Sequence, residues 1–257
     1  MNIATLPGKF HELDKQRQAE LDEARLIQSS MLPEKSLRAG EVTVSHEFHP
    51  VDEVGGDFLD YFELSDGTVG LYLGDVSGKG LAAAMYAALA VGTLRGVHKT
   101  GQSPSAVLGL LNKRLLLRSL PRRHTAMQYA VFDPRSREMQ IASAGMPGPL
   151  YLSGKGCQAL ELSGIPPGLL PEATYDVTTL RLQPGESLLF CTDGITEAFD
   201  PLGEGFGIER LVALCGKHGG ASAAELLPEI SRALGRFCRE AEQHDDRTAA
   251  FFHTAGE

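Results

Sequence analysis

The chain contains no tryptophan, and only 4 of its 257 residues are cysteine. No two cysteines have the Cys-x-x-Cys spacing of zinc-binding proteins, which argues against a zinc site. A secretion signal is also absent, and scattered cysteines without one are typical of a reducing compartment. We therefore expect a cytoplasmic protein, with its cysteines scattered at positions 157, 191, 215 and 238.

Long apolar runs and an excess of positive charge are absent too. The longest uninterrupted apolar run, residues 81–91, is well short of the roughly 18 residues needed to cross a bilayer, and it predicts a buried helix. The 24 Lys and Arg residues stand against 33 Asp and Glu, giving a net charge of −9. This balance argues against nucleic acid and anionic membrane as main partners. The 42% of hydrophobic residues can furnish the core of one large or two small domains.

Aspartates at the edges of strand-like runs are the most informative feature that is present. The apolar runs 69–73 and 187–191 each end shortly before an aspartate, and the run 248–252 begins just after two of them. If the third run is antiparallel to the others, all these acids lie at one edge. Carboxylates from distant strands suit Mg²⁺ or Mn²⁺, which also offset the cost of burying like charges together. The segments are Gly55-Gly56-Asp57, Gly74-Asp75, Thr192-Asp193-Gly194 and Asp245-Asp246-Arg247-Thr248.

Each of these acids also has a simpler interpretation. Asp-Gly and Gly-Asp are common turn signals, so Asp193 alone indicates a turn and Asp57 alone a turn or a helix cap. Only the four segments taken as a set indicate a metal site.

The rest of the chain predicts strands alternating with helices. Helices are expected over 11–31, ending before Pro33, over 103–119 with Ser103 as its cap, and over 221–239. A strand is expected over 42–48 and a hairpin over 127–132 and 138–142, with a further turn at 180–186. Strand pairs followed by helix pairs favour sheets layered between helices.

The aspartate segments belong to an ordered series of motifs that extends from about residue 20 to residue 252. This series resembles the SpoIIE/RsbU-type protein phosphatases, bacterial members of the metal-dependent PPM (protein phosphatase 2C-like) superfamily. The resemblance implies an α/β (α+β) fold with a central antiparallel β-sandwich flanked by helices. It also implies a helical linker or regulatory segment at 1–35 and a PPM-type phosphatase domain at 36–257. Its motifs are Val54 to Asp60, Gly74 to Met85, Ala144 to Leu150, Gly164 to Leu169, Thr192 to Ala198, Gly203 to Leu211 and Asp245 to Thr248.

The same resemblance assigns the metal ligands, two divalent cations (Mn²⁺ or Mg²⁺) being held by the acids. Asp57 and Asp75 match the pair that binds both cations, and Asp193 and Asp245 match two further ligands; these four acids are the expected catalytic residues. Two ligands complete the set, the backbone carbonyl of Val76 and, as its weakest member, Asp246.

One departure from the family pattern is visible in the Ala-Gly-x-Pro segment. Met146 stands where the family often has histidine, which puts a substrate-handling role of that side chain in doubt. Lys79 and Arg123 are the candidates for holding a phosphate.

The reaction that the resemblance implies is hydrolysis of phosphoserine or phosphothreonine by a metal-activated water. The implied substrate is a phosphorylated STAS-type anti-sigma-factor antagonist of a partner-switching pathway. A catalytically inactive phosphoprotein-binding module and a small-molecule phosphoesterase are the alternatives. The N-terminal helix either packs on its own domain or contacts a regulatory partner or a second copy of the chain.

Overall fold

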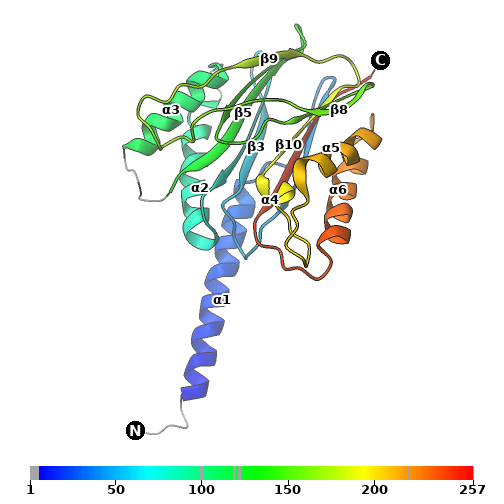
Figure 1. The fold of residues 1–257 in the computed structure, drawn as a ribbon. Coiled ribbons are helices and arrows are strands. Elements are labelled where there is room, and N and C mark those ends of the chain that lie inside the picture. Colours follow the sequence, from blue (N-terminus) through cyan, green and yellow to red (C-terminus); the bar gives the residue numbers. More distant parts are fainter. Residues whose placement is uncertain (1–5, 99–100, 118–119, 121–122, 219, 257) are drawn as a thin grey trace.

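Two antiparallel β-sheets face each other, and helices cover both outer faces (Figure 1). The computed structural model describes residues 6–98, 101–117, 120, 123–218 and 220–256. The expected β-sandwich flanked by helices is therefore confirmed. The six-stranded sheet has the order β1 (Ser36–Ala39), β2 (Val42–His49), β11 (Arg247–Thr254), β10 (Ser187–Cys191), β7 (Leu150–Ser153), β8 (Gly156–Ala159). The five-stranded sheet has the order β3 (Phe58–Glu63), β4 (Val69–Val76), β5 (Thr125–Asp133), β6 (Glu138–Ala144), β9 (Thr178–Arg181).

The apolar side chains form three layers because each sheet is buried on both faces. Between the sheets, Phe132 of β5 meets Phe252 of β11 edge to face, with ring centroids 5.2 Å apart. Helices α2 (Gly80–Arg95) and α3 (Pro104–Leu116) cover the outer face of the five-stranded sheet, where Tyr72 is buried. The outer face of the six-stranded sheet is covered by α4 (Asp193–Thr196), α5 (Gly207–Lys217) and α6 (Ala223–Cys238).

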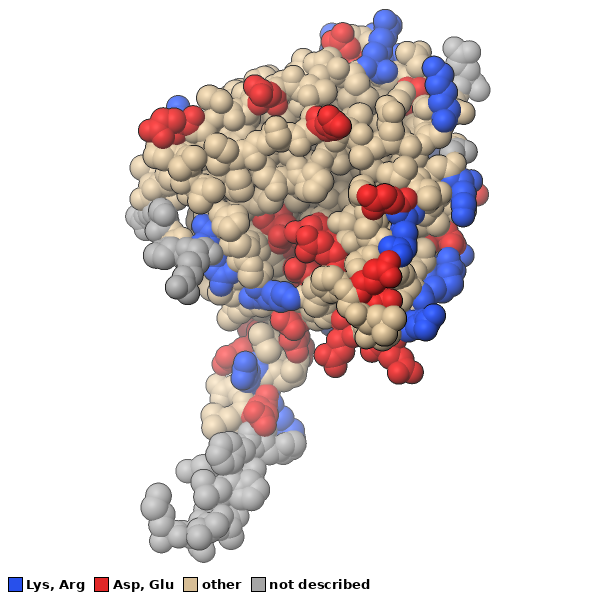
Figure 2. Space-filling view, viewed as in Figure 1, with Lys and Arg blue, Asp and Glu red and all other residues tan. Residues whose placement is uncertain are grey.

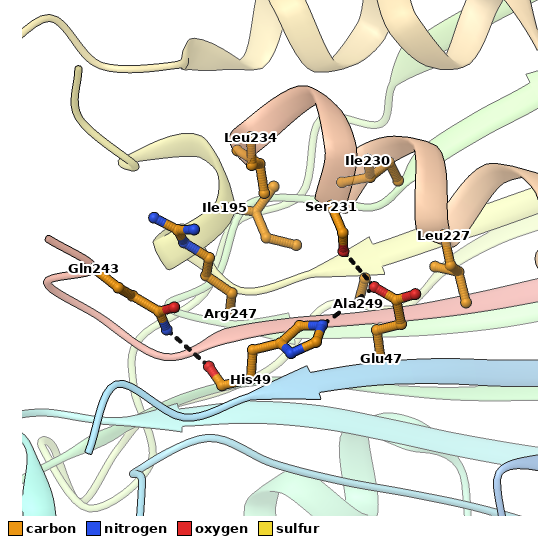
Figure 3. A pocket seen from close by; sticks show the side chains of 10 residues that line it. All are labelled: Glu47, His49, Ile195, Leu227, Ile230, Ser231, Leu234, Gln243, Arg247 and Ala249. Atoms are coloured by element: carbon orange, nitrogen blue, oxygen red, sulfur yellow. Dashed lines mark hydrogen bonds and ion pairs between the residues drawn. The ribbon is translucent and has the colours of Figure 1, made fainter. Parts of the chain in front are cut away.

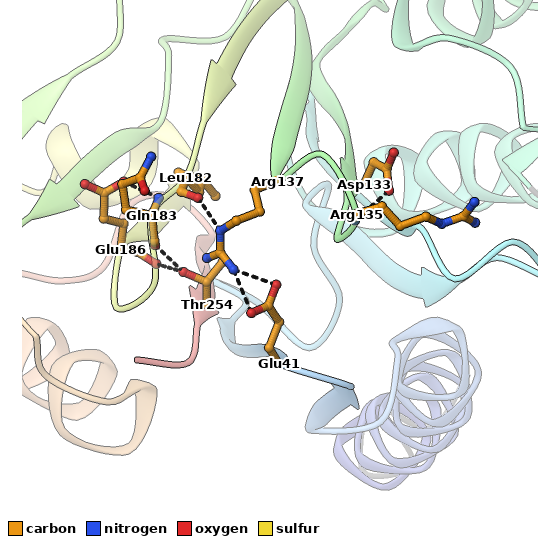
Figure 4. Close-up of polar contacts among 8 residues, drawn as sticks. All are labelled: Glu41, Asp133, Arg135, Arg137, Leu182, Gln183, Glu186 and Thr254. Atoms are coloured by element: carbon orange, nitrogen blue, oxygen red, sulfur yellow. Dashed lines mark hydrogen bonds and ion pairs between the residues drawn. The ribbon is translucent and has the colours of Figure 1, made fainter. Parts of the chain in front are cut away.

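A polar network closes one end of the sandwich (Figure 4). Arg137, in the turn between β5 and β6, donates from Nη1 to both carboxylate oxygens of Glu41 at 2.7 Å. Its Nε donates to the carbonyl of Leu182 at 2.8 Å, and Thr254 Oγ1 donates to the carbonyl of Gln183 at 2.8 Å. Since β11 ends at Thr254 and begins at Arg247, this network lies at the opposite end of the sandwich from Asp245 and Asp246.

Helix α1 (Leu6–Met31) extends away from the sandwich as a stalk (Figure 1). It begins earlier than the predicted residue 11, and residues 12–20 are exposed. The division of the chain near residue 35 stays a prediction. Among the described residues, no helix is both long and apolar enough to span a bilayer.

Some expectations need correction. The prediction that residues 81–91 form a buried helix is only half right, because Leu81, Met85 and Leu89 of α2 are 51%, 68% and 51% exposed. They follow one another at intervals of four residues, so one face of α2 is apolar and uncovered. Helix α3 ends at Leu116, and the predicted continuation at 118–119 lies outside the described residues. Strands β1, β3 and β7 to β9, and helices α4 and α5, were not predicted, and β9 includes the first two residues of the turn expected over 180–186.

Candidate metal centre

The ends of β10 and β11 bring two of the predicted acids together. These strands are antiparallel neighbours with Cys191 opposite Ala249, so Asp193, just beyond β10, and Asp245, just before β11, lie at the same end of the sheet. Gly194 shows how closely the two segments approach. A Cβ atom there would lie 1.9 Å from the Asp246 carbonyl oxygen and 3.3 Å from Asp245 Cβ, so only glycine fits.

The five-stranded sheet supplies the other two acids from the adjacent strands β3 and β4. Asp57 directly precedes β3, and Asp75 lies near the end of β4, where Phe58 pairs with Gly74. A Cβ atom on Gly56 would lie 2.8 Å from the Val76 carbonyl oxygen and 3.4 Å from Asp75 Oδ1. The absence of a side chain at Gly56 therefore lets the Asp57 loop approach the predicted carbonyl ligand of Val76.

The acids of the two sheets interact electrostatically. Burial, followed by the charges of Asp75 and Asp246, raises the pKa of Asp57 well above its ordinary value. Burial raises the pKa of Asp75 to about 7, with further contributions from Asp193, Asp245 and Asp246. The pKa of Asp193 is raised by burial first and then by neighbouring acids. Asp57, Asp75, Asp193 and Asp245, the four predicted catalytic acids, are thus brought to one end of the sandwich.

No positive side chain compensates these charges in the part of the chain that the structure describes. The ion pairs found there involve other acids, on β2, β3 and α6 and in loops away from this cluster. Figure 2 shows acidic side chains gathered in a hollow near the centre of the view, where α4 lies in Figure 1. Several ionised carboxylates buried close together repel one another, and a bound divalent cation is the usual way in which proteins offset this repulsion.

Two threonines hold Asp57, and the sequence patterns did not single them out. Thr192 Oγ1 and Thr248 Oγ1 donate hydrogen bonds to Asp57 Oδ2 at 2.8 and 2.5 Å, and all three side chains are buried. Both bonds oppose the rise in the pKa of Asp57 and fix the direction of its carboxylate. A detectable signal existed, since each threonine adjoins the acids within the motifs Thr192-Asp193-Gly194 and Asp245-Asp246-Arg247-Thr248.

Asp246 anchors the loop that carries Asp57. Its Oδ1 accepts the backbone N–H of Val51 at 2.8 Å, and its Oδ2 accepts those of Gly56 at 2.6 Å and Asp57 at 3.2 Å. The Asp246 carboxylate also occupies the place where a Cβ of Gly55 would be. The role of Asp246 as a metal ligand stays a prediction, whereas its anchoring role was missed.

Gln28 connects the stalk helix to the same loop. Its side chain is buried, donates to the Gly55 carbonyl at 2.7 Å and accepts the Gly55 N–H at 3.0 Å. The two bonds therefore satisfy both the backbone N–H and the backbone carbonyl of Gly55, which lies two positions before Asp57. Helix α1 is thereby bound to the loop that carries Asp57.

The remaining predicted residues take different positions. Lys79 is exposed at the start of α2, whereas Arg123 is half-buried and donates to the Ser77 carbonyl, two residues after Asp75. Met146 is buried in the core between the two sheets.

The donor set suits hard divalent cations. The predicted ligands are carboxylate oxygens and one carbonyl oxygen, with no nitrogen or sulfur atom, and such donors favour Mg²⁺ or Mn²⁺. No three acidic, histidine or cysteine side chains among the described residues form a ready-made cage around one point. Because Mg²⁺ keeps several of its waters and needs few protein ligands, carboxylates spread over two facing sheets fit two hydrated ions.

Known proteins resemble this chain over most of its length. The family model described as "Stage II sporulation protein E (SpoIIE)" matches residues 65–254. Phosphoserine phosphatase RsbU of Bacillus subtilis (strain 168) is 27% identical, the match covering 95% of this chain and 71% of RsbU. Protein IcfG of Synechocystis sp. is also 27% identical, but the match covers 89% of this chain and only 40% of IcfG. The chain therefore spans less than half the length of IcfG.

A solved structure confirms the architecture. The SiaA-PP2C domain of Pseudomonas aeruginosa superposes with a TM-score of 0.83 at 25% identity, covering 94% of this chain and 98% of that domain.

Proposed function

Because the chain belongs to the SpoIIE family, we propose that it is a metal-dependent protein phosphatase that hydrolyses phosphoserine and phosphothreonine. The observation that carries the proposal is the convergence of Asp57, Asp75, Asp193 and Asp245 from two facing sheets, with no compensating positive side chain among the described residues. Phosphatases of the PPM superfamily depend on divalent cations.

The chain's own residues would hold and orient two such ions, Mn²⁺ or Mg²⁺. The proposed ligands are the four acids and the Val76 carbonyl, with Asp246 as the weakest member. When bound, the ions supply a water of lowered pKa and stabilise charge on the phosphoryl group. Thr192 and Thr248 fix the carboxylate of Asp57 for this purpose. Arg123, at the edge of the Asp75 loop, is the proposed contact for a phosphate oxygen.

The proposed substrate is a phosphorylated STAS-type anti-sigma-factor antagonist in a partner-switching pathway. The support is the similarity to RsbU, named a phosphoserine phosphatase, and to the RsbU domain of the Mycobacterium tuberculosis protein Rv1364c, whose structure also contains an RsbW domain. We further propose that α1, the main part of the regulatory segment 1–35, contacts a regulatory partner or a second copy of the chain, because most of its surface is exposed.

The test is release of phosphate from a phosphoserine peptide with and without Mn²⁺. We expect turnover that EDTA abolishes and that Asp193→Asn reduces by about 100-fold or more, since a ligand to the reacting metal is lost. Asp66→Asn, which alters an exposed acid in a turn, is the matched control and should keep full activity. Activity that persists in both EDTA and the Asp193 variant would contradict the proposal.

Two further measurements address the alternatives. An inactive binding module should show no tight two-ion binding when Mn²⁺ is titrated calorimetrically. A small-molecule phosphoesterase should prefer small phosphate esters over the phosphopeptide.

A further inference from the structure

A cavity of about 200 Å³ lies between α6 and the six-stranded sheet (Figure 3). One wall is apolar and comes mainly from α6, through Leu227, Ile230 and Leu234. The polar groups that face it include Glu47 of β2, Ser231 of α6 and Arg247 of β11. An apolar pocket with a few convergent polar groups is the usual form of a small-molecule site.

The strand register explains why two opposite charges line this cavity. Arg247 pairs with His49 and Ala249 pairs with Glu47, so Arg247 and Glu47 are diagonal neighbours on the face covered by α6. Long side chains at diagonal positions are within reach of each other. Among the ion pairs of the described residues, however, Glu47 and Arg247 do not pair with each other.

Neither charged side chain contacts the other, and the Arg247 guanidinium lacks a good hydrogen-bond acceptor. Glu47 accepts a hydrogen bond from Ser231 and lies 3.3 Å from His49 Nε2. Arg247 Nη2 has only the weak acceptor Cys238 Sγ at 3.5 Å, and its buried Nε has no partner within the described part of the chain. A guanidinium with unsatisfied donors is costly to bury, and an anion such as a carboxylate is its best partner.

We propose that this cavity binds a small aliphatic amino acid such as leucine. Its carboxylate would pair with Arg247, its ammonium group would contact Glu47, and its alkyl side chain would lie on the leucines and isoleucine of α6. An uncharged apolar ligand would leave the Arg247 guanidinium without an anionic partner, and a simple carboxylic acid would place a second negative charge near Glu47.

The position of the cavity links it to the candidate metal centre. Ile195, which also lines it, follows Asp193 by two residues, and Arg247 follows Asp245 by two. A ligand bound there would contact the segments that carry two of the four acids. The proposal itself is independent of the proposed phosphatase activity, because binding is measured directly.

The first experiment compares three ligands of matched alkyl group by calorimetric titration of the full chain. L-leucine carries both charges, 4-methylpentanoate only the acid and isoamylamine only the amine. We expect L-leucine to bind at least about tenfold more tightly than either single-charge analogue, the factor given by one lost charged hydrogen bond. Equal affinity for 4-methylpentanoate or isoamylamine, or no binding of leucine at all, would overturn the proposal.

The second experiment locates the site. Arg247→Met retains the alkyl stem of the side chain and should weaken leucine binding by about tenfold or more. Arg232→Met, a change on α6 at a side chain that is 63% exposed, is the matched control and should leave binding unchanged. Should Arg247→Met fail to fold, Ser231→Leu fills the cavity from the α6 side and should abolish binding. An unchanged affinity for leucine in the folded Arg247 variant, or leucine binding by the Ser231 variant, would refute this location.

Discussion

Replacing Asp246 by alanine should destabilise the fold far more than replacing its neighbour Asp245. The Asp246 carboxylate is 3% exposed and accepts three backbone N–H groups, those of Val51, Gly56 and Asp57. Each buried donor left without an acceptor costs about 1–3 kcal/mol. Since water entering the space would satisfy part of the loss, we expect Asp246→Ala to lower the free energy of unfolding by about 3–5 kcal/mol, a large share of a typical total of about 5–15 kcal/mol.

Two further variants grade this effect. Asp246→Asn keeps one acceptor oxygen, so it should cost about 1–2 kcal/mol if that oxygen continues to bind Gly56 and Asp57. Asp245 is half-buried and its Oδ1 accepts a single N–H, that of Asp246, so Asp245→Ala should cost about 1 kcal/mol or less.

The assay is denaturation by urea in EDTA, so that lost metal binding does not contribute. Because the chain contains no tryptophan, the transition is followed by far-UV circular dichroism. The dependence of the unfolding free energy on urea concentration must be equal among the variants, so that differences in the midpoint of unfolding report differences in stability. If Asp246→Ala unfolds within about 0.5 kcal/mol of the unaltered chain, the range of an ordinary surface substitution, the anchoring role is refuted.

Three further changes test the surroundings of Asp57. Thr248→Val removes one of the two hydroxyls on Asp57, which should raise the pKa of this acid further and weaken Mn²⁺ binding by about tenfold in calorimetry. Gly56→Ala places a methyl group against the Val76 carbonyl and should reduce phosphopeptide turnover by about tenfold or more, because a 1 Å displacement at a reacting site is that costly. Gln28→Ala should speed amide hydrogen exchange at Gly55, because that peptide loses both of its partners.

Matched controls exist for these changes. Thr68→Val removes a hydroxyl bonded to the exposed acid Asp66 and should leave Mn²⁺ binding unchanged. Gly92→Ala, at a helical glycine with open space around it, should leave turnover unchanged. Exchange at Gly55 should be unaffected by Gln16→Ala, since the Gln16 side chain makes an exposed contact with Glu20 on the same helix. A control that matches its test variant would contradict the corresponding interpretation.

The strands that carry the acids could be predicted because they have a local signature. The runs 69–73 and 187–191 are short, apolar and bounded by glycine or threonine-aspartate, and both are buried strands. Short edge strands lack this signature, since the pattern of β9 (Thr178–Arg181) is largely exposed and set by its pairing with β6. The burial of residues 81–91 was overestimated, because an apolar run shows that a helix is apolar but not which of its faces is covered by other elements.

The acids that meet at the candidate site could be selected from the sequence, but the residues that hold them could not. A carboxylate beside glycine is visible in one short segment. The bonds from Thr248 to Asp57 and from Gln28 to Gly55 join residues 191 and 27 positions apart, and nothing local encodes them. Such contacts arise only when the sheets face each other and α1 meets the loop.

The two hydrogen bonds between Gln28 and Gly55 limit how strongly a change in α1 can affect the candidate metal centre through this contact. With 26 residues at about 1.5 Å each, α1 is a stiff rod about 39 Å long. The coupling between α1 and Gly55 through this contact cannot exceed the free energy of the two bonds, which together contribute about 1–3 kcal/mol. A signal that acts through these two bonds can therefore change the properties of the centre by about 5- to 150-fold at most, so this contact suits graded adjustment of the centre.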